Sequence, residues 1–170
     1  MGIASTGYKI LFLLHILFAI IGFGAVLLNG IYAAEAKKRR GAEGFAIFKA
    51  NERVSKIAEI FILLVPVMGI GLVFMSDGVW AFNQTWVWFA LVVFGIALTI
   101  QFAVMMPAVK RHESLMLELV AAPGPEGSAG PPPQAAQLEA NGKKLAMSGA
   151  ILQIALLTIL VLMIWKPGLV

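Results

Sequence analysis

The first apolar run of the chain, residues 8–34, contains two polar residues and a glycine that are spaced seven positions apart. They are His15, Gly22 and Asn29, and this spacing of two helical turns places all three on one face of a helix. An imidazole or an amide that faces lipid costs free energy. We therefore expect this stripe to face other helices, and His15 to be the centre of any chemistry inside the membrane.

A metal or haem iron could take His15 as a ligand, because imidazole binds both iron and copper. The other histidine, His112, lies at the opposite membrane boundary and cannot share that site. A second ligand would be a methionine: Met68 is predicted at about the depth of His15 from the helical rise per residue, and Met163 lies nearer the surface. The simpler alternatives are a His15 bonded to a neighbouring backbone carbonyl, and methionines that only fill space.

The elements that would position these residues are four long apolar runs. The chain is 60% hydrophobic and 13% charged, whereas soluble domains carry about 25% charge. About 20 apolar residues cross a bilayer, so we predict an all-α integral membrane protein, one antiparallel four-helix bundle over residues 1–170. The absence of cysteine excludes disulfides and thiolate ligation. The predicted helices lie at about 8–34, 54–75, 86–109 and 144–165.

The positive charges indicate topology, because cytoplasmic loops of membrane proteins carry an excess of Lys and Arg. Most of the 13 basic residues fall between the first and second runs or between the third and fourth. We predict a multi-pass protein of the bacterial plasma membrane, surrounded by lipid, with both termini outside and no nucleic-acid partner. The basic residues of these two connections are Lys37, Lys38, Arg39, Arg40, Lys49, Arg53, Lys56, Lys110, Arg111, Lys143 and Lys144.

Three more polar side chains interrupt the later runs: Glu59, Gln101 and Gln153. Glu59 is expected either to pair with Lys56 or Arg53 at the interface, or to carry protons, since acids inside membranes are candidates for function. With Asn29, these residues are too few and too spread in depth to line a pore. No catalytic residue can be assigned from them.

Two segments outside the apolar runs are also predicted. Residues 44–53 form either an amphipathic piece on the membrane surface or a helical extension of the second run. Residues 121–136, rich in Pro, Gly and Ala, form a flexible cytoplasmic loop, because such a composition buries little apolar surface.

Lys9 and His15 at the start of the first run, followed by Gly22, Gly24 and Asn29, resemble a bacterial four-helix family of predicted integral membrane proteins of unknown function. That family looks related to CopD-like copper-resistance domains and to the HemJ-type protoporphyrinogen oxidase. The start of the second run, Glu52-Arg53, and the ending Trp165-Lys166-Pro167 are similar to the HemJ-type pattern.

This resemblance implies a role for His15 in binding haem b. Two positions depart from the HemJ-type pattern, with Asn29 where that family has an arginine and Gln101 where it has a histidine. These departures argue against porphyrinogen oxidation. Three hypotheses follow: electron transfer by haem b held through His15 with Met68 nearby, an accessory subunit of a larger membrane complex or homo-oligomer, and transport of copper or another small solute.

Overall fold

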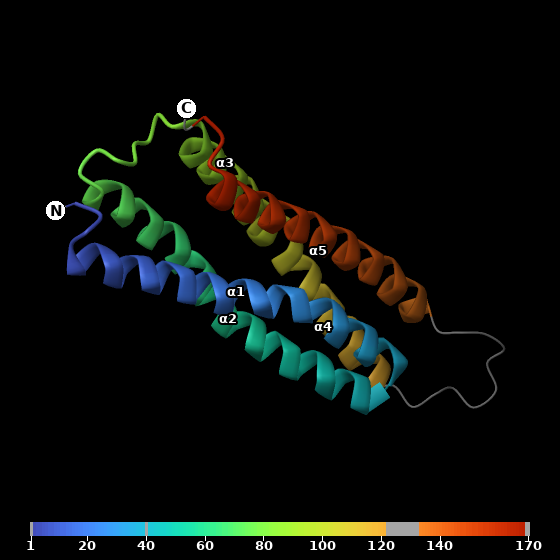
Figure 1. The fold of residues 1–170 in the computed structure, drawn as a ribbon. Helices are drawn as coiled ribbons and strands as arrows, with labels where there is room; N and C mark the ends of the chain where they lie inside the picture. Colours follow the sequence, from blue (N-terminus) through green and yellow to red (C-terminus); the bar gives the residue numbers. More distant parts are fainter. Residues whose placement is uncertain (1, 40, 122–132, 169–170) are drawn as a thin grey trace, which may run out of the picture.

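Four long apolar helices make up the protein in the computed structural model, which describes residues 2–39, 41–121 and 133–168 (Figure 1). Each is long and apolar enough to cross a membrane, so the predicted all-α bundle is confirmed. The third helix consists of two α-helical parts joined by a π-helical turn, η1. The elements are α1 (Thr6–Lys38), α2 (Gly41–Met75), α3 (Thr85–Ile100), η1 (Gln101–Met105), α4 (Met106–Ala121) and α5 (Pro133–Trp165).

The helices form two antiparallel hairpins (Figure 1). α1 lies along α2, while α3 and α4 both lie along α5. Fewer contacts join the hairpins, mainly between α2 and α4 and between α1 and α5. Both chain termini lie at one end, with residues 76–84, and we call this the terminal end. The other end, where α1 ends and α4 ends, is called the basic end.

The helices run beyond the apolar stretches that predict them. α2 begins at Gly41, so residues 44–53 are a helical extension rather than a separate surface piece. α5 begins at Pro133, a favoured first helical residue because its fixed backbone angle suits the helix and its missing N–H is not needed there. Of the predicted loop 121–136, residues 122–132 lie outside the described residues, and 133–136 are helical.

The π-helical turn lies just before a proline. In η1 the backbone N–H of Met106 donates to the carbonyl of Gln101, five residues back instead of four. Pro107 has no N–H and its ring crowds the carbonyl four residues earlier, which disfavours a regular α-helical turn at this point. The extra residue in the turn rotates α4 relative to α3.

Candidate functional site

The stripe on α1 faces α2 along its whole length, as predicted. His15 donates from Nδ1 to the Val65 carbonyl at 2.9 Å. Gly22 lies so close to Ile62 that an added Cβ would be 2.6 Å from Ile62 Cγ1. Asn29 Oδ1 accepts a hydrogen bond from Ser55 Oγ at 3.0 Å. Both polar members of the stripe therefore bond to α2 instead of facing lipid.

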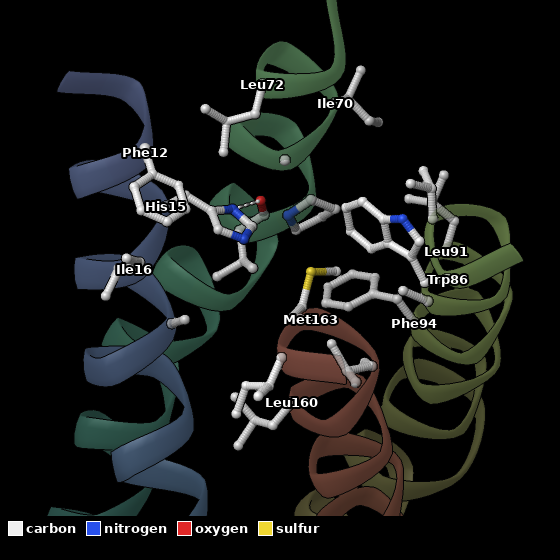
Figure 2. A pocket seen from close by; sticks show the side chains of 18 of the residues that line it. Phe12, His15, Ile16, Ile70, Leu72, Trp86, Leu91, Phe94, Leu160 and Met163 are labelled. Carbon is white, nitrogen blue, oxygen red and sulfur yellow. Dashed lines mark hydrogen bonds between the residues drawn. The ribbon is translucent and has the colours of Figure 1, made fainter. Parts of the chain in front are cut away.

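A cavity of about 960 Å³ separates the hairpins in the half of the bundle near the terminal end. Its volume lies at the upper end of the range for ligand sites, about 300–1,000 Å³. The lining is mostly apolar and includes aromatic rings from several elements (Figure 2). Representative wall residues are Phe12, Ile16 and Phe23 from α1, Pro66 and Ile70 from α2, Trp86, Leu91 and Phe94 from α3, and Leu160 and Met163 from α5.

His15 lies on the wall of this cavity (Figure 2). Its ring fits against α2 because residue 69 is glycine: a Cβ there would lie 3.2 Å from His15 Cε1. In the neutral imidazole, donation from Nδ1 to the Val65 carbonyl leaves the lone pair on Nε2. A ring fixed by a backbone carbonyl in this way is the usual arrangement of a histidine that binds a metal.

The two methionines considered from the sequence are placed differently. Met163 on α5 lines the cavity, and Figure 2 shows its sulfur directed toward the space between the hairpins. Met68 is half-buried on α2 and is not part of the cavity wall. The structure therefore brings Met163, and not Met68, to the same cavity as His15.

The remaining intramembrane polar residues do not gather at His15. Gln101 is the first residue of η1, a helical element that forms no part of the cavity wall. Gln153 borders a second cavity of about 80 Å³, whose other walls include Phe23 and Leu157. Both of these apolar residues also line the large cavity, so Gln153 lies just beyond the deep end of that cavity.

Glu59 does not form the predicted salt bridge. Lys56 instead pairs with Glu52 at 2.7 Å, and no ion pair joins Glu59 to Arg53. One carboxylate oxygen of Glu59, Oε1, is buried with no hydrogen-bond partner among the described residues. The alternative, a proton-carrying carboxyl, stays a prediction.

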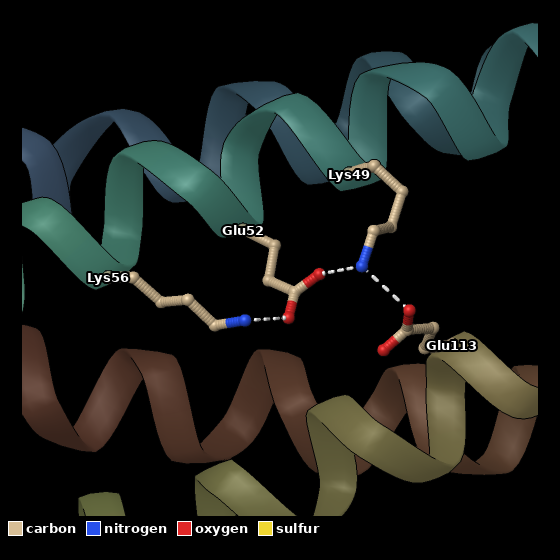
Figure 3. Close-up of polar contacts among 4 residues, drawn as sticks. All are labelled: Lys49, Glu52, Lys56 and Glu113. Atoms are coloured by element: carbon tan, nitrogen blue, oxygen red, sulfur yellow. Dashed lines mark hydrogen bonds and ion pairs between the residues drawn. The ribbon is translucent and has the colours of Figure 1, made fainter.

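An ion-pair network joins the hairpins near the basic end (Figure 3). Lys49 on α2 binds Glu52 one turn further along and Glu113 on α4, the latter at 2.6 Å. Glu52 also accepts from Lys56. Lys49 and Glu52 precede the apolar run 54–75, Lys56 lies near its start, and Glu113 follows the third apolar run. The hydrogen bond from Lys49, and then that from Lys56, lower the pKa of the Glu52 carboxyl below its usual value.

The second histidine belongs to this basic end. His112 lies on α4 against the ring of Phe48, with a centroid distance of 5.4 Å. Its Nδ1 is 3.4 Å from Asn141 Nδ2 on α5. His112 is thus separated from the cavity that His15 lines, as the sequence predicts, and it serves as an internal control for His15.

Sequence reasoning missed two charged residues of the cavity. Lys9 on α1 and Lys166, just after α5, both line it. Their positions at the membrane boundary look ordinary in the sequence. The signal that could have found them is that they are the two basic residues outside the basic loops.

In the part of the chain that the structure describes, no three His, Cys, Asp or Glu side chains converge as a metal site.

Comparison with known proteins identifies a family and no characterised relative. No curated protein and no solved structure matches the chain. One family model matches residues 9–167, which is nearly the whole sequence. The chain belongs to the family described as predicted integral membrane protein (DUF2269), and it is a multi-pass protein embedded in a lipid bilayer.

Proposed function

We propose that this protein binds haem b in the large cavity, where His15 would hold the iron, and that it serves electron transfer in the membrane. The observation that carries the proposal is the orientation of His15. Its Nδ1 is held by the Val65 carbonyl, and the ring lies on the wall of a cavity of about 960 Å³. Nε2 is then the ring nitrogen available to a ligand.

The residues present fit haem b. A porphyrin needs an apolar site with room for a flat ring, and aromatic side chains such as Trp86 and Phe94 supply such walls. The iron needs at least one strong axial donor, which a neutral imidazole provides. His15 is half-buried, and the cavity that it lines is mostly apolar.

The residues of the chain would have separate roles. His15 would bind the iron, and Val65 and Gly69 would keep its ring in place through the hydrogen bond and the space described above. Met163 supplies a thioether on the α5 side of the same cavity. The apolar walls would exclude water. When bound, haem b supplies a one-electron couple whose potential depends on its axial ligands and on burial.

The test is an absorption spectrum of the protein purified in detergent after expression with ample haem, first oxidised and then reduced with dithionite. We expect a Soret band and sharp α and β bands in the reduced form. His15→Ala should remove most of this absorption, whereas the matched variant His112→Ala should keep it. Met163→Leu should alter the reduced spectrum if the thioether is the second ligand.

Two results would contradict the proposal. The first is a colourless wild-type protein under these conditions. The second is an equal haem content in wild type and His15→Ala. A colourless protein that purifies with fixed partner subunits would favour the accessory-subunit alternative, and His15 would then be a residue that packs α1 against α2.

A further inference from the structure

Two lysines are set apart from every other basic residue of the chain. Eleven of the 13 Lys and Arg residues belong to the two basic loops and their flanks, where the topology pattern of membrane proteins explains them. Lys9 and Lys166 are the other two, and both line the large cavity. Their position at the mouth of an apolar cavity calls for a different explanation.

The surroundings hold Lys166 over the mouth. Its Nζ lies 4.1 Å from the centre of the Trp80 ring and 5.6 Å from that of Trp86, within range of a cation–π interaction. Trp80 is itself fixed by donating from Nε1 to Tyr8 Oη at 2.8 Å. Lys166 also has a φ of 44°, an uncommon backbone conformation for a residue other than glycine.

Neither lysine is neutralised by the described part of the chain. No carboxylate oxygen of residues 2–39, 41–121 or 133–168 lies within 4.0 Å of either ammonium group. The cavity below them is almost entirely apolar. The site thus combines an apolar chamber with two cations at one end, which matches a ligand that has an apolar body and acidic groups at one edge.

We propose that Lys9 and Lys166 form a carboxylate-binding mouth, which selects ligands that carry free acid groups on an apolar body. The inference deepens the proposed function and rests on it, since haem b is an apolar macrocycle with two carboxylates on one edge. The lysines would pair with these carboxylates at the membrane surface while the ring lies deeper, beside His15. Charge-assisted hydrogen bonds of this kind are about twice as strong as neutral ones.

The test compares each acid with its ester in nanodiscs of zwitterionic lipid. Apo protein is titrated with haem b and with haem b dimethyl ester, which has the same ring and iron but no acid groups. A second pair is a fluorescent long-chain fatty acid and its methyl ester. We expect wild type to bind each acid about tenfold more tightly than its ester, which corresponds to about 1.4 kcal/mol.

Variants of the two lysines test whether these residues cause the preference for the acid over the ester. The double variant Lys9→Gln/Lys166→Gln should bind acid and ester alike, and Lys9→Arg/Lys166→Arg should keep the preference for the acid. The Soret wavelength of bound haem should not change in the double variant, because His15 is intact. Lys144→Gln, at the basic end, is the matched control and should behave as wild type.

The outcomes separate this inference from the proposed function. If no form of haem binds but the fatty acid is still preferred over its ester in a lysine-dependent way, the haem proposal fails and the carboxylate-binding mouth stands. If acids and esters bind equally to wild type, or if the double variant keeps the preference, the mouth is not a carboxylate site. A His15-dependent Soret band in that case would leave the haem proposal in place.

Discussion

The two ends of this bundle differ in what lies between the two hairpins. At the basic end the hairpins are tied by side-chain bonds, such as the ion pair between Lys49 on α2 and Glu113 on α4. At the terminal end the same hairpins enclose a cavity of about 960 Å³. Figure 1 shows the hairpins lying closer together toward the basic end and diverging toward the termini.

The difference shows where the free energy that holds the hairpins together is located. Apolar helices gain little by leaving lipid for one another, because lipid tails are equally apolar. Polar bonds therefore decide which surfaces stay in contact. Among the described residues, the ion pair that joins the two hairpins, between Lys49 and Glu113, lies at the basic end. At the terminal end the hairpins are instead separated by the large cavity.

The largest expected effect comes from filling the cavity. Gly24 lines it, and a Cβ at this position would meet nothing within 4 Å. Gly24→Trp should therefore fold normally but lose at least tenfold in haem affinity, measured by titration and the Soret band. Gly30→Trp is the control, because Gly30 also has open space around it but lies outside the cavity wall. Equal affinity in both variants would show that the ligand binds elsewhere.

A smaller effect is expected from separating α1 and α2. In Gly22→Ala the new Cβ would lie 2.6 Å from Ile62 Cγ1 and 3.1 Å from the Ile62 backbone nitrogen. Since backbone must move, we expect a loss of about 1–3 kcal/mol in stability, the usual cost of overpacking. The measurement is the unfolding midpoint in detergent. Gly30→Ala should not lower it, and an unchanged midpoint in Gly22→Ala would contradict the close packing of the stripe.

The smallest effect concerns the ion pairs at the basic end. Because Lys49 and Lys56 lower the pKa of Glu52 in the folded state, its contribution is fully present above the ordinary pKa of about 4.5 and is lost as the pH falls through the lower folded value. Wild type should therefore lose stability in that window, and Glu52→Gln should reduce this dependence. Glu139→Gln, which removes an exposed pair within α5, is the control. If stability depended on pH in the same way in all three proteins, the ion pairs of Glu52 would not contribute to stability.

Much of the fold was predictable because lipid imposes simple rules. Runs of apolar residues long enough to cross a bilayer locate the four helices, and the spacing of His15, Gly22 and Asn29 identifies the face of α1 that packs on α2. Helix ends were less predictable, since the helical extensions outside the membrane, such as residues 41–53, lack the apolar signal.

The partners of His15 could not be predicted to the same degree. Depth along a helix follows from residue number, but the rotation of a helix that is apolar on all sides does not. For this reason Met68 has the expected depth but not the expected face, while Met163 lines the cavity. Likewise, the pairing of Lys56 with Glu52 rather than Glu59 depends on side-chain geometry that spacing alone leaves open.

The π-helical turn η1 makes the third helix sensitive to length as well as to composition. Deleting a single residue from Gln101–Met105 would remove the extra residue of the turn and rotate the helix that follows by about 100°. Glu113 would then swing away from Lys49, and Ala108 away from Asn141. The rotation of α4 relative to α3 is thus set by one inserted residue. Deleting that residue would separate Lys49 from Glu113 at the basic end, although no residue of η1 lines the cavity.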